Sequence, residues 1–559
     1  MDREGHVVGD APGPANPLGV RPAVTGRDRK ALAVAFLIAA LAFAWQTYRF
    51  NWVIDDAFIS YRYAKHLAQG AGLRFNVGED PPVEGYSNLL WVLLLAPFER
   101  IGWPVTVVSR VLSVACGVVL LWRVIRFLQW SLSPSPLQLI LSALFFATLP
   151  PVAMWATSGL ATMPCALLIF LTFEFVLAGP RSPRPVAGAV ASALLVLVRV
   201  DGMIWVGGVI VLAVLVALVR RDKTAVKPIA VCAAVAAITL LGLTCFRLAY
   251  HGWLLPNTVY AKTGLCAASL QRGGRHILSF LAIFPHLATI LAAAAVVLLR
   301  DRRAWTVGHH AGAMAVGAFA YAVVVGGDWM PMGRFLVPAM PFLAVLFALL
   351  IRRMVRRTAV VSACALTAVV LSLLPAYNWH VVPHDWRRAL RLRGKPGLVA
   401  SEYDKWVKQR RFTEDFTALG RALSRHTKLG ESLIAGSIGA VGYYTELFIY
   451  DTFGLANVEV AHREIPPGSV GAIIHDKSVP RSYFLKYRPT YYSARILELR
   501  SDSRVRAGPD GRVRLGKRFE GLRSPEARAL YEAVGYLLPA GEKGGGRKVL
   551  LLHVRRDLL

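Results

Sequence analysis

The sequence predicts an α-helical polytopic membrane protein with about eleven transmembrane helices and a polar C-terminal α/β domain. Of the 559 residues, 55% are hydrophobic, and the mean hydropathy is +0.47. The apolar residues fall in nearly uncharged blocks of roughly 15–25 residues, about the length that a helix needs to cross a bilayer. Soluble domains carry about 45–50% apolar residues, and the strands of outer-membrane barrels alternate apolar with polar positions. These blocks therefore exclude a soluble enzyme, a fibre, a disordered chain and an outer-membrane barrel.

The N-terminal residues 1–30 are polar and rich in Gly and Pro, so we expect them to be a disordered cytoplasmic segment. They end in a basic run at 27–30. The first apolar run follows directly and has no small-residue cleavage pattern after it, which predicts a retained first helix instead of a removed signal peptide.

Eleven apolar segments make up the predicted transmembrane domain, residues 31–376. Several are short, as tilted or broken helices in a bundle tolerate. The segments are 31–50, 104–127, 137–152, 158–178, 186–200, 202–220, 228–250, 276–299, 308–326, 335–351 and 358–376.

The loops between these segments sort into two kinds, one short and rich in Arg and Lys, the other longer and rich in Trp, Tyr, Asn, Asp and Pro. Cytoplasmic loops carry the excess of basic residues. If every basic loop lies in the cytoplasm, successive loops alternate strictly between the two sides of the membrane. The N-terminus is then inside and residues 377–559 are outside. The first outer loop is then 51–103, in which the short apolar run 89–97 predicts an interfacial or re-entrant helix or, alternatively, part of a longer second span.

The outer segment 377–559 reads as a small α/β domain. An amphipathic pattern predicts a helix over 411–429. Short strands are predicted at 433–435, 448–451, 490–494 and 549–554. The glycines of 436–442 lack the spacing of the dinucleotide-binding fingerprint, so a strand–turn–helix packing role is the better interpretation.

Charge and cysteine content indicate which partners, disulfides and metal sites are expected. The formal charge is +30, and part of it comes from the basic loops; the rest favours contact of the tail with anionic lipid or an acidic glycan. Because no nucleic-acid motif is present, nucleic acid is not an expected partner. The six cysteines form no CxxC pair, which argues against a disulfide framework or a zinc site.

The first candidate site is the carboxylate pair Asp55 and Asp56, directly after the first predicted span. Adjacent carboxylates repel each other and tend to raise one pKa, which suits a proton acceptor. The alternative is a solvated helix end. The loop that follows combines aromatic rings with Asn and carboxylates, the groups that bind the faces and hydroxyls of sugars.

Several sequence blocks carry a resemblance to GT-C membrane glycosyltransferases, in particular to the terminal arabinofuranosyltransferase B group and its wider bacterial relatives. The blocks cover most of the chain and are specific in combination. They are Asp-Asp-Ala-Phe-Ile-Ser-Tyr-Arg-Tyr-Ala at 55–64, Gly-Ala-Gly-Leu-Arg-Phe-Asn-Val-Gly-Glu at 70–79, Val-Glu-Gly-Tyr-Ser-Asn-Leu-Leu-Trp at 83–91, Trp-Ala-Thr-Ser-Gly-Leu at 155–160, Leu-Pro-Asn-Thr-Val-Tyr-Ala-Lys at 255–262, Gly-Gly-Asp-Trp-Met at 326–330 with Arg-Phe-Leu-Val-Pro at 334–338, and Gly-Tyr-Tyr at 442–444 with Asp451 and Gly-Leu at 454–455.

The chain departs from the pattern of that group at three places. Ala161 stands where relatives commonly carry Glu, Arg199-Val-Asp201 stands where Arg-Pro-Glu is usual, and His475-Asp476-Lys477 only loosely matches a His-x-Lys element. These departures bear on donor and acceptor identity more than on reaction type.

The resemblance implies a multi-pass enzyme of the bacterial inner membrane that transfers a sugar from a polyprenyl-phosphate donor to a cell-envelope glycan or glycolipid. The sugar is a pentofuranose such as arabinofuranose by analogy. All matched blocks lie outside in the charge-based topology, where a lipid-linked donor can arrive and cytoplasmic nucleotide sugars cannot. The expected reaction is inverting, with Asp55 or Asp56 as the base.

Three cations at the membrane boundary are candidates for the donor phosphate, namely Arg199, Lys262 and Arg334. The alternative for each is snorkelling to the interface. Candidate acceptor or sugar contacts are Arg62, Glu84, Tyr86, Asn88, Asn257, Tyr260, Asp328, Trp329, Trp379 and His380. Among these, Asp328 has the alternative of a helix cap, Glu84 of a salt bridge, and His380 of a packed linker residue. No cofactor is certain, although a divalent metal held by Asp55, Asp56 and Asp328 is possible.

Two other functions stay open at the level of sequence. A transporter or flippase of a lipid-linked sugar is less favoured because the halves show no repeat and the polar residues cluster on one side. A non-catalytic cell-envelope scaffold is hard to reconcile with the carboxylate pair among so many outer motifs, although the departure at Ala161 keeps it open.

Overall fold

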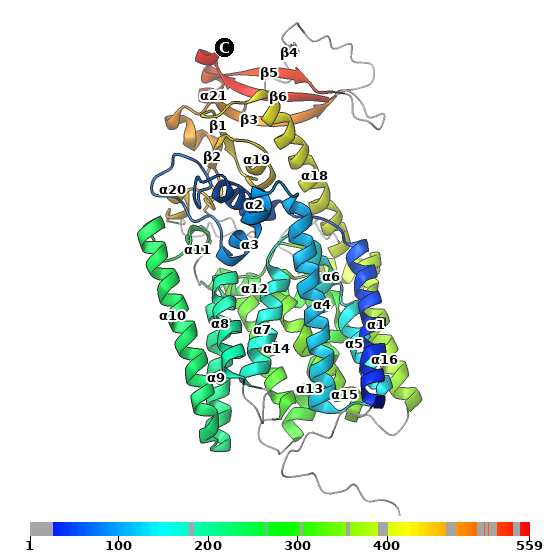
Figure 1. Cartoon of the computed structure of the whole chain (residues 1–559). Helices are drawn as coiled ribbons and strands as arrows, with labels where there is room; N and C mark the ends of the chain where they lie inside the picture. Colours follow the sequence, from blue (N-terminus) through cyan, green and yellow to red (C-terminus); the bar gives the residue numbers. More distant parts are fainter. Residues whose placement is uncertain are drawn as a thin grey trace, which may run out of the picture.

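The computed structural model places a bundle of apolar helices below a mixed β-sheet, with two short helices between them (Figure 1). These short helices are α2 (Asp55–Ala68) and α3 (Leu89–Arg100). The structure describes residues 26–177, 184–262, 264, 266–301, 306–353, 358–389, 401–464, 477–499, 508, 512–513, 522–539 and 548–559.

The bundle overlaps all eleven segments that hydropathy singled out. In the described ranges, seven helices are long and apolar enough to cross a membrane, or up to nine if each of two bent pairs is one span; α7 and α8 are shorter apolar helices. The bundle elements are α1 (Gly26–Arg49), α4 (Val105–Leu132), α5 (Pro136–Thr148), α6 (Pro150–Thr157), α7 (Thr162–Val176), α8 (Pro185–Val198), α9 (Gly202–Arg220), α10 (Val226–His251), α12 (Ala267–Ile283), α13 (Pro285–Arg300), α14 (Val307–Val324), α15 (Met340–Arg353) and α16 (Thr358–Leu373).

Proline breaks two of the expected segments. The α5–α6 pair bends by 51° just before Pro150, and the α12–α13 pair bends by 101° just before Pro285. Proline disfavours helical geometry at the residue before it and cannot donate the next helical hydrogen bond. Each of these two expected segments is therefore two helices that meet at an angle.

The two ends of the bundle differ in charge. The α9–α10 hairpin, with Arg220 and Arg221 at its turn, lies at the end far from the sheet (Figure 1). The start of α1 lies at this end too. Of the predicted cytoplasmic segment, residues 1–25 fall outside the described residues, whereas 26–30 already belong to α1. The basic turn and the sheet thus occupy opposite ends.

The C-terminal domain has one long helix, α18 (Glu402–His426), and a six-stranded mixed sheet in the order β2-β1-β3-β6-β5-β4. The four predicted strands are confirmed, and β4 and β5 were missed. A capping box of Ser401 with Asp404 starts α18 earlier than the predicted residue 411. The strands are β1 (Ser432–Ala435), β2 (Phe448–Asp451), β3 (Tyr491–Glu498), β4 (Arg512–Val513), β5 (Tyr531–Leu537) and β6 (Lys548–Arg555).

Shorter elements complete the fold and join its two parts. The segment after β1 forms the predicted strand–turn–helix, ending in α19, which packs against α2 and α18. The remaining elements are η1 (Lys223–Ala225), α11 (Asn257–Tyr260), η2 (Arg334–Ala339), η3 (Leu374–Tyr377), α17 (His384–Ala389), α19 (Gly439–Tyr444), α20 (Val458–Ala461), η4 (Arg481–Tyr487), α21 (Pro525–Leu530) and η6 (Arg556–Leu558).

Candidate active site

The carboxylate pair lies at the first turn of α2, held there by the turn at 155–160. The main-chain N–H of Ile54 donates to the carbonyl of Ser158 at 3.0 Å. The indole of Trp91, on α3, donates to the carbonyl of Gly159 at 3.1 Å. Two of the sequence blocks thus act together to place the start of α2 at the top of the bundle.

Asp55 faces the C-terminal domain. Its carboxylate accepts hydrogen bonds from the main-chain N–H groups of Gly439 at 3.3 Å and Ala440 at 2.8 Å, and the residue is buried. Burial raises the pKa of Asp55 to about 6; the charge of Asp56 adds to the rise, and the two N–H bonds oppose it. Asp55 therefore serves as a cap for α19 and joins the outer loop to the C-terminal domain.

Asp56 faces a cleft of about 300 Å³ between α2 and the C-terminal domain, here called the Asp56 cleft. Its volume is at the lower end of the range for small-molecule sites. Asp55 also borders it. The other side chains that line it combine aromatic rings, an amide and a hydroxyl: Trp329, Gln409, Phe412, Ser437 and Phe453, together with Ile54, Ile59, Gly436, Ile438 and Leu455.

The turn at 328–334 connects this cleft to the predicted cations. Asp328 accepts a hydrogen bond from the N–H of Met330 at 3.2 Å and forms an ion pair with Arg334 at 2.9 Å. The buried carboxylate of Glu402, on α18, accepts the N–H of Met332 at 2.5 Å. Trp329 lines the Asp56 cleft, whereas Arg334 lines the next cavity.

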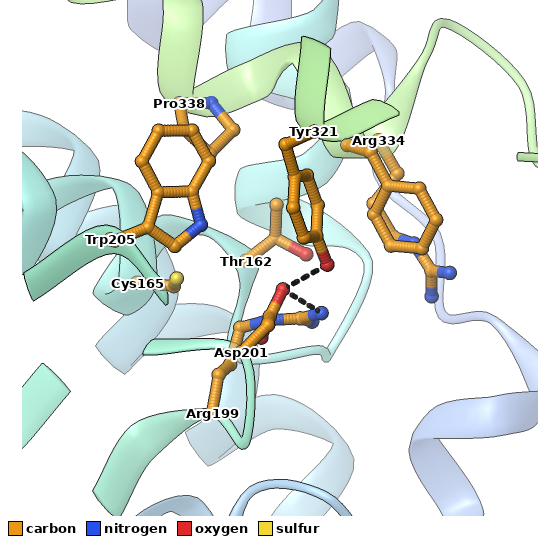
Figure 2. Close-up of a pocket in the computed structure, with 9 residues that line it drawn as sticks. Thr162, Cys165, Arg199, Asp201, Trp205, Tyr321, Arg334 and Pro338 are labelled. Carbon is orange, nitrogen blue, oxygen red and sulfur yellow. Dashed lines mark hydrogen bonds and ion pairs between the residues drawn. The ribbon is translucent and has the colours of Figure 1, made fainter. Parts of the chain in front are cut away.

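A cluster of charged side chains occupies that second cavity (Figure 2). The carboxylate of Asp201 lies between the guanidinium of Arg199, at 2.7 Å, and the hydroxyl of Tyr321, with which it also hydrogen bonds. The enclosed space is about 20 Å³, room for about one water molecule. Arg199 is thus neutralised by a carboxylate two residues further along the chain.

Lys262 lies near the same cluster and has a different environment. Lys262 is exposed to solvent, although many protein atoms surround its ammonium group. Desolvation of the ammonium group and the neighbouring charges of Arg334 and Arg199 together lower the pKa of Lys262 to about 8. Among the described residues, no carboxylate lies within ion-pair distance of its ammonium group.

Several predicted sugar contacts are buried and hydrogen bonded to other parts of the protein. Glu84 forms an ion pair at 2.9 Å with Arg247, and both side chains are 3% exposed. The Asn257 amide donates to the carbonyls of Gly454 and Leu455, at 2.7 and 3.0 Å. In the same way, Tyr86 bonds to His251, Asn88 bonds to Ser60, and Arg62 donates to the carbonyls of Phe75, Gly442 and Leu447.

The remaining predicted contacts lie elsewhere. The ring of Tyr260 packs on His462 with centroids 4.3 Å apart. Trp379 is 70% exposed just beyond η3, and neither it nor His380 lines the Asp56 cleft or the cavity of Figure 2. In the described parts of the chain, no three His, Cys, Asp or Glu side chains gather as a metal site would require.

Sequence reasoning missed the residues that the C-terminal domain and the bundle interior contribute. Gln409 and Phe412 are on α18, and Phe453 follows β2. The sequence around these residues does not predict that they line a site. Tyr321 lies in an apolar helix, where a hydroxyl needs a partner, and Asp201 stands two residues after Arg199. Those two positions had a signal in the sequence, and Asp201 already stood out as a departure from the pattern of the resembling group.

Comparisons with known proteins agree with this architecture. Residues 403–548 match the model of a domain of unknown function, DUF8728. A terminal β-(1→2)-arabinofuranosyltransferase of Mycobacterium tuberculosis is 27% identical over 249 residues, which cover 42% of this chain and 38% of that protein. The match thus spans well under half of this curated relative.

A solved structure shows the same fold over nearly the whole chain. The crystal structure of ArnT from Cupriavidus metallidurans bound to undecaprenyl phosphate superposes with a TM-score of 0.51 at 13% identity, covering 95% of this chain and 98% of that one. The apo structure of the same protein gives 0.48 at 15% identity with the same coverage. The chain therefore has the fold of ArnT, and its expected resemblance to GT-C membrane glycosyltransferases of the arabinofuranosyltransferase kind is confirmed.

Proposed function

We propose that this protein is a membrane glycosyltransferase that moves a sugar from a polyprenyl-phosphate donor to a cell-envelope glycan or glycolipid. The observation that carries the proposal is the 328–334 turn, which places Trp329 in the Asp56 cleft and Arg334 in the cation cluster. A carboxylate on one side of the turn can take the proton from the acceptor hydroxyl. The cations on the other side can bind the phosphate of the donor.

The comparisons support the choice of donor. The ArnT structure contains undecaprenyl phosphate, and the curated relative is named for transfer of arabinofuranose. The charge of the loops supports an outer location for the sheet, α2 and the cleft. A lipid-borne sugar reaches such a site through the bilayer of the inner membrane, and a cytoplasmic nucleotide sugar does not.

In the proposed reaction Asp56 removes the proton from an acceptor hydroxyl. The oxygen attacks the anomeric carbon of the donor, a new carbon–oxygen bond forms, and the bond to the phosphate breaks with inversion. The electron pair leaves with the polyprenyl phosphate, and Asp56 holds the proton. Asp55 is a less suitable base because it is buried and caps α19, whereas Asp56 is partly exposed in the cleft.

The leaving phosphate gains negative charge in the transition state, so a cation placed beside it lowers the barrier. Lys262 and Arg334 are the candidates, since Lys262 is solvent accessible and Arg334 keeps donors beyond the one used on Asp328. Arg199 is engaged by Asp201, which makes it a supporting residue of the cluster.

The test compares Asp56→Asn with Asp55→Asn in the purified protein, with a polyprenyl-phosphate sugar and a cell-envelope glycan fraction as substrates. General-base catalysis contributes about 10²–10⁴-fold, so we expect Asp56→Asn to lose transfer by that factor with unchanged folding. Asp55→Asn should instead lower thermal stability and retain measurable transfer. Asp385→Asn, whose side chain is 92% exposed, is the matched control.

Full transfer by Asp56→Asn would remove the base assignment. Mass spectrometry of the polyprenyl lipid that co-purifies with the protein identifies the donor sugar. A protein that exchanges this lipid across vesicle bilayers without transferring its sugar would be a transporter, and the proposal would be wrong.

A further inference from the structure

We propose that the segment from Tyr377 to Trp386 lies at the surface of the bilayer, on the side of the sheet, as an interfacial anchor for the C-terminal domain. This segment and the end of α1 carry a set of large side chains that are each between 41 and 78% exposed, here called the aromatic rim. The aromatic rim consists of Trp45, Tyr48, Tyr377, Trp379, Val381 and Trp386.

The aromatic rim begins where two membrane-spanning segments end. The segments Asp28–Arg49 and Ala359–Tyr377 are both long and apolar enough to cross a bilayer. Their last turns meet, because the indole of Trp45 donates a hydrogen bond to the hydroxyl of Tyr377 at 3.2 Å. The rim therefore starts at the level at which two helices leave the bilayer.

The composition of the segment fits the membrane–water interface. Tryptophan and tyrosine favour the headgroup layer, because each ring is apolar and has one polar group. Between Tyr377 and Trp386 the rings are interspersed with Asn, His and Asp, and these ten residues are too few and too polar to cross a bilayer. Contiguous exposed apolar side chains mark a surface that a partner covers. Because the rim continues the lipid-facing surface of two helices, we assign the bilayer as that partner.

The anchor is connected to the lower end of α18 through Arg49. The guanidinium of Arg49 donates two hydrogen bonds to the carbonyl of Ala376, at 3.1 and 2.9 Å, and its Cζ atom lies 4.0 Å from the ring centre of Tyr377. The ring centre of Tyr403, in the first turn of α18, lies 5.6 Å from the same atom. One cation thus joins the end of α1, the start of the anchor and the start of α18.

A second connection lies one residue further along the chain. The amide of Asn378 donates to the carboxylate of Asp404, also in the first turn of α18, at 3.3 Å. Figure 1 shows this lower end of α18 beside α1 and α16. A rim that rests on the bilayer therefore restrains the position of α18, the helix that brings Gln409 and Phe412 to the Asp56 cleft.

The test measures where the segment lies in the membrane. The variants Trp379→Cys and Trp386→Cys are made in full-length protein that lacks the six native cysteines, labelled with a nitroxide, and reconstituted in vesicles of phosphatidylethanolamine and phosphatidylglycerol. Electron paramagnetic resonance compares collisions of the label with oxygen, which concentrates in lipid, and with a nickel chelate, which stays in water. We expect an oxygen-to-nickel ratio severalfold above that of Leu429→Cys, an exposed position beyond the upper end of α18, and below that of Leu41→Cys, an exposed position within α1.

The connection to α18 has its own measurement. A nitroxide at Lys408→Cys, an exposed position of α18, should become more mobile in the double variant Trp379→Ser/Trp386→Ser. The matched control is Leu429→Ser, which removes an exposed apolar side chain at the other end of α18 and should leave the label unchanged. Unchanged mobility in the double variant would show that the rim does not restrain α18.

Two results would overturn the anchor itself. A ratio at Trp379 and Trp386 equal to that of Leu429→Cys would place the segment in water, and labels that reach neither reagent would show that protein covers the rim. If either tryptophan variant fails to fold, Val381→Cys reports on the same surface. Sugar transfer is not measured in these experiments, so their outcome is independent of the proposed function.

Discussion

The carboxylate of Asp55 accepts the main-chain N–H of Gly439, although the two residues are 384 positions apart in the chain. The backbones meet so closely that a Cβ atom on Gly439 would lie 1.9 Å from the main-chain oxygen of Asp55. On the other side of α19, Arg62 donates to the carbonyl of Gly442 at 2.5 Å. Helix α2 therefore holds α19 at both ends, and this clamp joins the outer loop to the C-terminal domain.

We predict that Gly439→Ala weakens this clamp. A methyl group has no room there, and overpacking of this kind costs about 1–3 kcal/mol. Thermal unfolding and limited proteolysis of the purified protein should show a less stable C-terminal domain. Gly242→Ala is the control, because Gly242 is on α10 with no atom within 4 Å of its Cβ position. Equal stability of the two variants would contradict the close contact.

Glu402 is expected to position the 328–334 turn. Its carboxylate is buried and accepts the N–H of Met332, a non-glycine residue held at φ 54°. We predict that Glu402→Gln lowers kcat with little change in insertion, because a misplacement of about 1 Å can cost about 10²-fold in rate. Steady-state kinetics measures the effect.

Two further variants separate positioning by Glu402 from a general loss of folding. Glu414→Gln, at an exposed position of the same helix, should behave like the wild-type protein. Glu402→Asp should lose activity as well, since its shorter side chain does not reach the Met332 N–H. Unchanged kcat in Glu402→Gln would show that the turn keeps its geometry without this bond.

Donor binding should weaken as pH rises through about 8. The pKa of Lys262 is lowered to about 8 by burial and by neighbouring cations, so its ammonium group loses its proton above that pH. Since only the charged form attracts phosphate, the KM for the donor should rise there. In Lys262→Arg the side chain stays charged, and the pH dependence should disappear. A wild-type KM that is flat between pH 7 and 9 would exclude Lys262 from phosphate binding.

Membrane orientation can be tested with single cysteines in a background that lacks the six native ones. Leu429, between α18 and β1, is 77% exposed. A Leu429→Cys variant should react with impermeant maleimide added to intact spheroplasts. A cysteine at Arg221, in the basic α9–α10 turn, should react only after permeabilisation. The reverse labelling pattern would invert the topology and remove the case for a lipid-borne donor.

The sequence by itself determined the helical bundle and the location of its polar end. Apolar blocks and basic loops are local properties of a chain, so they can be read without knowing any contact. The eleven segments and four of the strands were accessible from such local patterns, and the motif blocks around the carboxylate pair were accessible through the family resemblance. The breaks at Pro150 and Pro285 were implicit in the sequence too, although they divide segments that hydropathy alone joins.

Only the tertiary structure distinguished Asp55 from Asp56. Neighbouring residues on a helix point about 100° apart, so two adjacent carboxylates must face different surroundings, and what surrounds them comes from α19 and α18, far along the chain. The same holds for Phe412 and Gln409, whose place in the cleft depends on how the C-terminal domain docks. Periodicity shows which faces of a helix are apolar, whereas the partner of a polar side chain depends on which distant element packs against it.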